Sequence, residues 1–429
     1  MTHQHVDFAV AELGERTVAS PLRDTRFVDS DERVLYRNNL AELRDLVRAG
    51  EEPLSFELAG PRERVFFEPS TLKCGIVTCG GLCPGLNNAV RAIVLGLLDK
   101  YGVAEVYGLR FGFEGLVGKY DHKPVRLTGP RVNQIHELGG TVLGTSRGAQ
   151  PAADMVDTLQ RLGIGLLFTI GGDGTLQGAH EIAEEIHRRE LPIGVIGVPK
   201  TIDNDISYVE TSFGFETAVS AARDATRAAY VEASGHRGGI GLVKLMGRDS
   251  GFIAAFAALA DTNVGICLIP ENPFTLDGLL PALRDRLERD GHAVVVVAEG
   301  AGQDLLAATG EQDASGNVAH GDIGLFLKER IPERFEAEGL EVNLKYIEPS
   351  YLIRSLAANT RDAAFCQLLG FAAVDAGMAG KTDMVVGLWR RRFTHVPIPL
   401  AVSSRKKVNS EGRLWQSVLS ATGQPRDMR

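Results

Sequence analysis

The chain contains 429 residues, with 46 lysines and arginines against 55 aspartates and glutamates, and its formal net charge is −9. Hydrophobic residues make up 44% and charged residues 24%, which is typical of a globular chain, and the length predicts two or three domains with sizeable cores. The acidic balance argues against a nucleic-acid or anionic-membrane binder, and no apolar run approaches the roughly 18 residues of a spanning helix. We therefore expect a cytoplasmic protein that binds neither nucleic acid nor membrane.

The first 70 residues differ from the rest of the chain in their mixed charge, few glycines and lack of sustained apolar alternation. Leu40, Leu43 and Leu46 recur at helical spacing, and Gly50 supplies a stop signal for that helix. We interpret residues 1–70 as an N-terminal extension that packs on the main body. Its role is not evident from its sequence.

From residue 73 onward, short apolar runs alternate with amphipathic stretches. The predicted strands are Cys74–Cys79, Glu105–Leu109, Leu166–Ile170, Ile193–Val198, Ile240–Met246, Gly265–Ile269, Val294–Ala298 and Met384–Leu388. The predicted helices are Asn88–Leu98, Leu176–Arg188, Glu216–Glu232, Ser250–Ala260, Leu279–Arg289, Ile323–Phe335 and Arg361–Ala376. This alternation predicts parallel, doubly wound α/β sheets, in which ligands bind beyond the carboxyl ends of the strands.

The five cysteines include no CxxC pair. Cys74, Cys79 and Cys83 cluster in sequence, but no second group of His or Cys residues lies near them. A zinc site needs about four such ligands, so we interpret the cysteines as small buried residues in the reduced state.

The loop after the first of these strands contains Gly80 and Gly81 and opens a helix. Glycines at such a turn allow backbone N–H groups to approach a phosphate, and the helix N-terminus adds positive potential. The loop matches neither a Walker A motif nor GxGxxG, so taken alone it is equally well explained as a tight turn.

The next predicted phosphate loop, GGDGT at 171–175, also opens a helix. Asp173 is flanked by Gly172 and Gly174 and followed shortly by Thr175. A carboxylate among glycines at the end of a buried strand suits a Mg²⁺ ion held between protein and phosphate oxygens. A helix-capping aspartate is the structural alternative.

The loop PKTIDND at 199–205 follows the strand after that. It places Lys200 and Thr201 beside two carboxylates, Asp203 and Asp205. An ionised Asp203 has the chemistry of a general base toward an attacking hydroxyl, and Lys200 has the charge to compensate a phosphate. Charged residues of a solvated loop are the alternative.

Four motifs occur in order: GGxxPGxN at 80–87, GGDGT, PKTIDND, and Met246-Gly247-Arg248. In this order they resemble the 6-phosphofructokinase family over about residues 73–402. The N-terminal extension and the PKTIDND form resemble its longer branch, which includes pyrophosphate-dependent enzymes and the ATP enzymes of plants and trypanosomes.

The resemblance implies two interleaved, doubly wound α/β domains. The donor domain would take residues 71–214 and 353–384, and the fructose 6-phosphate domain would take 215–352 and 385–429 with the C-terminal tail. It also implies a homodimer or homotetramer, because the family's sugar-phosphate site borrows residues from a neighbouring subunit.

The implied reaction is phosphoryl transfer to the C1 hydroxyl of fructose 6-phosphate, a glycolytic step. By resemblance, Asp203 is the base and Thr201 and Lys200 act beside it. Asp173 is associated with Mg²⁺, and Arg248 contacts the transferring phosphoryl group. Phosphoryl transfer needs positioned charge rather than a protein nucleophile, which agrees with these residue types.

The remaining implied contacts fall into two groups. Those on the donor side are Gly80, Gly81, Arg147 in a GGTxLGxxR segment at 139–147, Gly172, Gly174 and Thr175. Those on the sugar-phosphate side are Asp205, Met246, Gly247, Glu299, Lys345, Tyr351 and Arg354. Two basic clusters, 390–392 and 405–407, receive no role and are interpreted as solvated faces.

The implied donor is ATP. Pyrophosphate enzymes of the family carry Asp where Gly174 stands, and that side chain would fill and charge the space of the ATP α-phosphate. Lys200 favours the alternative, a pyrophosphate-dependent enzyme, but it excludes nothing. More remote possibilities are an NAD or lipid kinase, which would explain only GGDGT, and a catalytically dead sugar-phosphate sensor, which is disfavoured because Asp203, Asp173 and Arg248 are all present.

Overall fold

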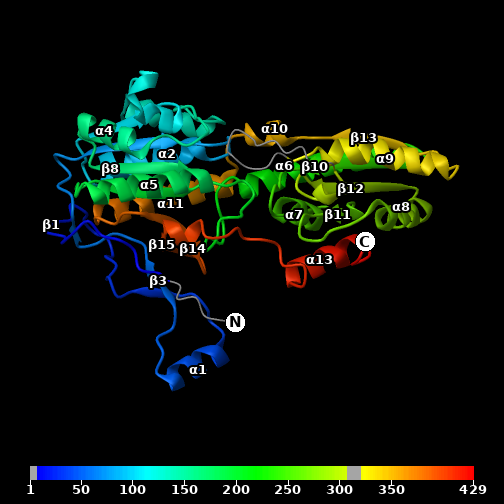
Figure 1. Cartoon of the computed structure of the whole chain (residues 1–429), viewed down its shortest axis with the longest axis horizontal. Coiled ribbons are helices and arrows are strands. Elements are labelled where there is room, and N and C mark those ends of the chain that lie inside the picture. Colours follow the sequence, from blue (N-terminus) through cyan, green and yellow to red (C-terminus); the bar gives the residue numbers. More distant parts are fainter. Residues whose placement is uncertain (1–6, 307–319) are drawn as a thin grey trace. The chain divides into compact units, whose positions relative to one another are not determined.

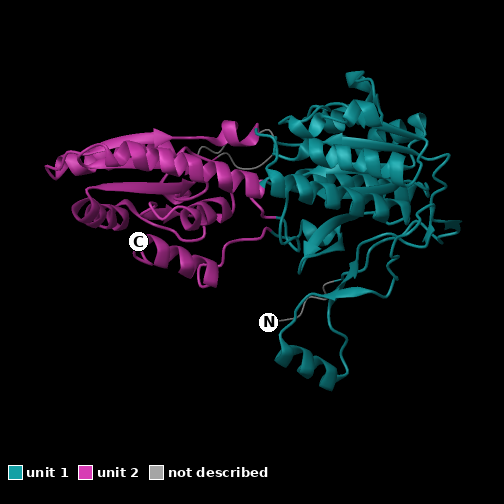
Figure 2. Ribbon diagram, turned by 180° about the vertical axis from the view of Figure 1, so that it is seen from behind, with its two compact units in different colours: residues 1–201, 206–214, 356–404 teal, residues 202–205, 215–355, 405–429 magenta. Residues whose placement is uncertain are grey.

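The computed structural model describes residues 7–306 and 320–429, and the chain divides into two compact units (Figures 1 and 2). Unit 1 comprises residues 1–201, 206–214 and 356–404, and unit 2 comprises 202–205, 215–355 and 405–429. Both units combine parallel strands with helices. The predicted fold class of two interleaved α/β domains is therefore confirmed.

The strands of unit 1 are β1 (Val18–Ala19), β2 (Arg33–Leu35), β3 (Ser55–Leu58), β4 (Arg64–Val65), β5 (Lys73–Thr78), β6 (Glu105–Leu109), β7 (Val125–Leu127), β8 (Leu166–Gly171), β9 (Gly194–Pro199), β14 (Met384–Trp389) and β15 (Arg392–Pro397). Its helices are α1 (Leu40–Ala49), α2 (Leu86–Leu95), α3 (Gly129–Val132), α4 (Ala152–Leu162), α5 (Asp173–Arg188), α11 (Thr360–Met378) and α12 (Ile398–Ala401). A π-helical turn, η1 (Gly96–Lys100), continues α2, and three short 3₁₀ turns are η2 (Gly112–Leu116), η3 (Gly118–Tyr120) and η4 (Ile135–Glu137).

Unit 2 contains β10 (Gly239–Leu245), β11 (Ile266–Leu268), β12 (His292–Ala298) and β13 (Asn343–Ile347). Its helices are α6 (Phe215–Ser234), α7 (Phe252–Ala260), α8 (Leu276–Asp290), α9 (Ile323–Ala337), α10 (Ser350–Arg354) and α13 (Arg413–Thr422), with a 3₁₀ turn η5 (Gln303–Leu305). None of the helices in the described ranges is both long enough and apolar enough to cross a bilayer.

The nine-stranded sheet of unit 1 has the order β2-β3-β15-β14-β9-β8-β5-β6-β7. Its centre, β14-β9-β8-β5-β6, is parallel, and its flanks are antiparallel. The central strands are almost wholly buried, which is why they read as continuous apolar runs in the sequence. Because β5, β8 and β9 are adjacent and parallel, their three following loops leave the same edge of the sheet.

Helices cover both faces of this central sheet. Residues of α4 and α5 pack in one core with Leu167 and Val195. On the other face, α11 packs on α2, and Gly377 of α11 approaches the side chain of Leu166, which neighbours Leu167 and so points to the opposite side. The predicted doubly wound arrangement therefore holds in unit 1.

The sheet of unit 2 is parallel throughout, with the order β11-β12-β10-β13. Residues of α8 and α9 pack with Leu242 and Val295 on one face, and α6 packs on the other, where Gly241 meets Ala229. Strand β13, which the sequence analysis did not predict, forms one edge, and all five of its residues are half-buried.

The N-terminal extension belongs to unit 1, where it lengthens the main sheet. Strand β3 pairs antiparallel with β15, and β2 pairs with β3. These strands escaped the sequence analysis because they are two to four residues long, and because the strand that anchors β3 in the sheet, β15, lies more than 300 residues away. The predicted helix is confirmed as α1, capped by Asn39 and ended by Gly50 in a left-handed conformation.

The predicted domain boundaries differ from the compact units in three places. Residues 202–205 and 353–355 were expected in the donor domain, but they lie in unit 2. Residues 385–404 were expected in the fructose 6-phosphate domain, but they lie in unit 1. The reason is strand pairing, because β15 returns antiparallel to β14 and joins the same sheet.

All five cysteines are buried and free, in agreement with their interpretation as small core residues. Burial raises the pKa of the Cys79 thiol to about 12, so this sulfur stays protonated at neutral pH.

A buried ion cluster fixes the N-terminal extension to the rest of unit 1. The carboxylate of Glu57, on β3, lies 2.6 Å from Lys381 Nζ and 2.7 Å from Arg62 Nη2. Burial by itself raises the pKa of Glu57, but hydrogen bonds and charges from His395 and Lys381 outweigh it and hold that pKa well below the usual value. Burial also lowers the pKa of His395, so near neutral pH the two permanent cations carry most of this stabilisation.

We predict that Glu57→Gln lowers the free energy of unfolding by about 3–5 kcal/mol at pH 7, because it leaves Arg62 buried without its counter-charge and Lys381 with Glu12 as its remaining carboxylate partner. The depressed pKa makes the contribution of Glu57 fully present above its unfolded value near 4 and progressively lost as the pH falls below it. Urea unfolding at pH 7 and pH 3.5 checks this, since the difference between the variant and the wild type should shrink at the lower pH. The control is Asp45→Asn on α1, whose side chain is 78% exposed and should have little effect.

Candidate active site

Three loops of unit 1 leave the carboxyl edge of β5, β8 and β9. Lys200, in the loop after β9, donates hydrogen bonds to the other two. Its backbone N–H donates to Gly171 O at 2.9 Å, and its Nζ donates to Gly81 O at 2.8 Å. The side chain is buried, with 7% exposure. Gly80 has φ = 82°, and a Cβ there would lie 3.3 Å from Lys200 Nζ, so the first loop needs glycine to sit this close to the lysine.

The segment 139–147 joins the same group of loops. The N–H of Gly80 donates to Ser146 O at 3.0 Å, and Thr145 Oγ1 donates to Gly80 O at 2.7 Å. A Cβ built on Gly81 would lie 3.5 Å from Arg147 Nη2, so the arginine side chain rests against the glycine backbone. The structure thus brings together Gly80, Gly81, Arg147 and Lys200, all of which belong to the motifs described above.

The GGDGT loop places Asp173 at the first position of α5 and buries Thr175. Gly172 precedes the helix, and a Cβ there would lie 3.2 Å from Lys200 O. Gly174 faces open space, with no atom within 4 Å of an added Cβ. Across residues 7–306 and 320–429, no three or more His, Cys, Asp or Glu side chains gather into a metal-binding group. A Mg²⁺ ion beside Asp173 would therefore take its other ligands from the donor phosphates and water.

Thr201 ends the part of the PKTIDND loop that belongs to unit 1. Its carbonyl accepts a hydrogen bond from Ser212 Oγ, which fixes the loop backbone as it leaves β9. The next residues, 202–205, belong to unit 2, so this one motif supplies both compact units.

In unit 2, Asp203 lies beside the turn that follows β10. The backbone nitrogen of Arg248 is 3.5 Å from Asp203 Oδ2, and Ser250 Oγ lies 3.4 Å from Asp203 O. Gly247 adopts φ = 127°, and a Cβ on it would lie 2.6 Å from Ser250 O. The turn after Met246 therefore requires glycine at this position.

Glu299 reaches the same place from the end of β12. Its N–H donates to Leu245 O at 2.9 Å, and Gly300 N–H donates to Gly247 O at 3.0 Å. A Cβ on Gly300 would lie only 1.8 Å from Arg248 O, so the two turns are in close backbone contact. Adjacent parallel strands β10 and β12 thus carry Arg248 and Glu299 to one point.

The electrostatic surroundings of Asp203 favour its protonated form. Burial raises the pKa of Asp203, and the carboxylates of Asp205 and Glu299 raise it further, while Arg354 and the Arg248 amide oppose the shift. Two like charges and low solvation therefore act in the same direction on this carboxyl. A carboxylate with a raised pKa is a stronger base than an ordinary aspartate.

Of the three predicted contacts in the segment 345–354, Arg354 lies near the Asp203 carboxylate and Tyr351 does not. Arg354, at the end of α10, is partly buried, and its charge acts on Asp203. Tyr351 is 84% exposed in this chain, and Lys345 lies on the edge strand β13. Within the described chain, therefore, unit 2 brings Arg354 to the carboxylates and leaves Tyr351 turned to solvent.

The sequence analysis missed one residue of this site, Arg405. Its Nη1 lies 3.1 Å from Asp205 Oδ2 and 2.9 Å from Asp249 Oδ2. The interpretation of the basic clusters as solvated faces is wrong for Arg405, whereas Arg391, Arg392 and Lys407 are exposed as expected. Arg390 donates from its guanidinium to the carbonyls of Leu35 and Tyr36. The only sequence signal for the contacts of Arg405 was the presence of two basic clusters, 390–392 and 405–407. Such a cluster does not show which of its cations pairs with a carboxylate.

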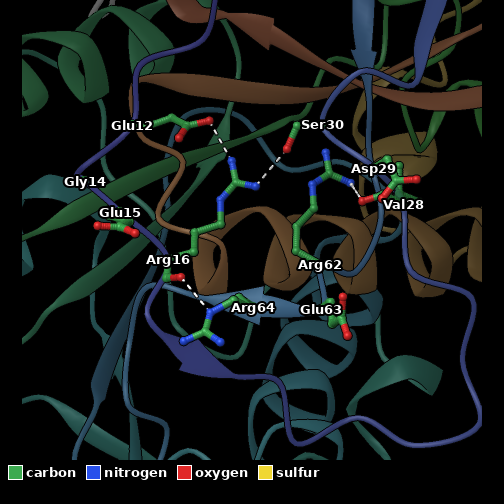
Figure 3. A pocket seen from close by; sticks show the side chains of 10 residues that line it. All are labelled: Glu12, Gly14, Glu15, Arg16, Val28, Asp29, Ser30, Arg62, Glu63 and Arg64. Atoms are coloured by element: carbon green, nitrogen blue, oxygen red, sulfur yellow. Dashed lines mark hydrogen bonds and ion pairs between the residues drawn. The ribbon is translucent and has the colours of Figure 1, made fainter.

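A cavity of about 530 Å³ lies within unit 1, lined by Glu12, Gly14, Glu15, Arg16, Val28, Asp29, Ser30, Arg62, Glu63 and Arg64 (Figure 3). None of these residues belongs to the motifs. Arg16 donates to Glu12 and Ser30, and Arg62 to Glu57 and to backbone carbonyls, so the cations serve the extension's own structure. We therefore assign the chemistry to the strand-end loops and not to this cavity.

Comparison with known proteins agrees with the motifs. The family model described as Phosphofructokinase matches residues 73–377. A protein of Borreliella burgdorferi named ATP-dependent 6-phosphofructokinase is 45% identical, and the alignment covers 100% of this chain and 99% of that protein. A protein of the same name from Trypanosoma cruzi is 47% identical over 86% of this chain and 77% of its own length.

Among solved structures, a pyrophosphate-dependent phosphofructokinase from Marinobacter aquaeolei superposes with a TM-score of 0.68 at 20% identity, covering 83% of this chain and 96% of that one. A phosphofructokinase from Saccharomyces cerevisiae gives a TM-score of 0.62 at 24% identity, covering 82% of this chain and 48% of that chain. At such identities these likenesses establish the fold alone. With a family model that spans most of the sequence and relatives at 45–47% identity over most of both chains, this chain belongs to the phosphofructokinase family.

Proposed function

We propose that the protein transfers the γ-phosphoryl group of ATP to the C1 hydroxyl of fructose 6-phosphate, giving fructose 1,6-bisphosphate. The observation that carries the proposal is the group around Asp203. A carboxylate whose pKa is raised lies against the Arg248 turn and near Glu299 and Arg354, which are the groups needed to deprotonate and hold an anionic sugar. Relatives that align with nearly the whole chain are named for this activity.

Unit 1 supplies the donor side of the proposed site. Lys200 and Arg147 place two cations beside the backbone of Gly80 and Gly81, where phosphate oxygens would be compensated and oriented. Thr175 and Gly172 complete the turn at the start of α5, whose N-terminus favours negative charge. Thr201 would hydrogen-bond the phosphoryl group in transfer.

Mg²⁺ is the proposed cofactor, with Asp173 as its protein ligand. Bound there, the ion would neutralise charge that develops on the donor phosphates. The residues present fit such an ion, because a single carboxylate at a helix start is the usual protein contribution to a Mg²⁺–phosphate site.

Unit 2 supplies the acceptor side. Asp203 would take the proton from the attacking hydroxyl, and Asp205 would act as the second carboxylate of the loop. Glu299 would accept hydrogen bonds from the sugar hydroxyls beside Met246 and Gly247, and Arg354, Tyr351 and Lys345 would meet the 6-phosphate. The proximity of Glu299 and Arg354 to Asp203 supports this division.

Removing the base should abolish most of the turnover. We expect Asp203→Asn to lower kcat by about 10²–10⁴-fold, with much less effect on substrate binding. In the wild type, kcat/KM should fall as the pH drops below the raised pKa of Asp203, so its acid limb should lie well above the ordinary aspartate value near 4. A variant that keeps a third of the wild-type kcat, or a limb at pH 4, would contradict this assignment.

The phosphate contact can be tested separately. Arg354→Ala should raise KM for fructose 6-phosphate at least tenfold, because a charge-assisted contact to a phosphate dianion is lost, and leave KM for the donor nearly unchanged. Initial rates with each substrate varied in turn provide the check. A rise confined to the donor KM would place the arginine on the wrong substrate.

The choice of ATP over pyrophosphate rests on Gly174. An added side chain would extend into open space, so Gly174→Asp should fold normally and act only by bulk and charge. We expect this variant to lose ATP-dependent kcat/KM by at least 100-fold, and Gly174→Ala to lose less. Lys200 favours pyrophosphate, so both donors should be assayed. Wild-type protein that turns over faster with pyrophosphate than with ATP would reverse the assignment.

Two rival functions have weaker support. An NAD or lipid kinase is not supported, because the family match extends over residues 73–377 and not over GGDGT alone. A catalytically dead sensor is disfavoured by the presence of Asp203, Asp173 and Arg248. A homodimer or homotetramer, and a cytoplasmic location, remain predictions.

A further inference from the structure

The last segment of unit 2 lies against the catalytic loop. Besides the two contacts of Arg405 Nη1 to Asp205 and Asp249, the backbone N–H of Lys406 donates to Asp205 O at 2.7 Å. Further along, Val408 N–H donates to Glu271 Oε1 at 2.8 Å. We call residues 405–408 the strap.

The strap and the Arg248 turn share one partner, Glu271, and are also joined by a direct ion pair. The carboxylate of Glu271 accepts from Val408 and also from Gly251 N–H at 3.0 Å, just before α7 begins. Arg405 in turn bridges Asp249 of that turn and Asp205 of the loop. The strap is therefore linked to the residues on both sides of this turn, directly through the Asp249 carboxylate and indirectly through the Glu271 carboxylate.

The charge of Arg405 matters because Asp205 is a buried carboxylate. Its side chain is 4% exposed, and an ionised group at that depth needs a nearby cation. Asp205 is also one of the two carboxylates that disfavour ionisation of Asp203, the other being Glu299. A cation on Asp205 weakens that repulsion.

We propose that Arg405 is a positioning residue for the phosphoryl transfer, which clamps the loop carrying Asp203 to the turn carrying Arg248 and neutralises Asp205. This inference rests on the proposed function, since it assigns Asp203 the role of base. It gives the C-terminal strap a part in the reaction although none of the recognised motifs includes it.

The clamp makes two separable contributions. The fork of the guanidinium fixes geometry, because one arginine meets two carboxylates on different segments. Its charge acts on Asp203 through Asp205, whose repulsion it offsets. Glu299, Arg354 and the Arg248 amide act on the Asp203 carboxyl directly. A lysine at 405 would keep the charge and lose the fork.

The test compares Arg405→Met and Arg405→Lys with Arg392→Met, a control that removes one exposed cation from the other basic cluster. Arg405→Met should lower kcat roughly tenfold or more and move the acid limb of kcat/KM to higher pH by about 0.5–1 unit. Arg405→Lys should restore the position of the limb while kcat stays reduced. The Arg392 variant should match the wild type in both.

A second variant separates this electrostatic effect from a general loss of structure. In an Asp205→Asn background, Arg405→Met should shift the acid limb much less, because the charge that Arg405 neutralises is gone. Hydrogen exchange gives a readout independent of turnover, and peptides covering 202–206 and 248–252 should exchange faster in Arg405→Met than in the control.

If Arg405→Met has the same kcat, the same acid limb of kcat/KM and the same hydrogen-exchange rates as the wild type, this inference is overturned and the proposed function stays intact. An equal shift of the limb with and without Asp205 would also overturn it, since Arg405 would then act only by stabilising the fold. Wild-type protein without phosphofructokinase activity would overturn the proposed function instead, and the exchange comparison would still decide whether the clamp exists.

Discussion

The adjacency of β5, β8 and β9 in one parallel ladder is the constraint on which the donor side depends. Parallel strands end at a common edge, so three loops separated by up to 120 residues leave the sheet side by side. Lys200 then donates hydrogen bonds to backbone carbonyls of the other two loops. These bonds form because the three strands are neighbours in the sheet. Glycine is required at position 80 because its φ is positive and Lys200 approaches its backbone closely.

The acceptor side rests on a different constraint, the compensation of buried negative charge. Asp203 and Asp205 lie in one loop and Glu299 follows β12, and the carboxylates of Asp205 and Glu299 add to burial in disfavouring the ionisation of Asp203. Arg354, which is distant in the sequence, opposes this effect on Asp203, and Arg405 forms an ion pair with Asp205. An aspartate poised between burial and these cations has the raised pKa that a general base at neutral pH needs.

In the N-terminal extension, the compensation of a buried negative charge contributes to stability. The strands of the extension are too short to fold alone, and they become part of unit 1 by pairing with β15 and by the buried cluster of Glu57, Lys381 and Arg62. Strand pairing satisfies the backbone of the segment, whereas the ion cluster fixes its register by matching one carboxylate to two cations. Arg390 adds backbone contacts to the same segment.

The sequence by itself determined the α/β class, most of the central strands and the motifs that place the chain in its family. It could do so because buried parallel strands are continuous apolar runs and because glycine–aspartate loops have few other uses. Only the tertiary structure decided that residues 385–404 join unit 1, that short strands of the extension lengthen its sheet, and that Arg405 meets Asp205. The β14–β15 hairpin enters the sheet through β9, β3 pairs with β15, and Arg405 meets Asp205, and each of these partners lies about 200 or more residues away in the sequence, so no local periodicity reveals it. An arginine that pairs with a carboxylate has the same sequence signature as a solvated one.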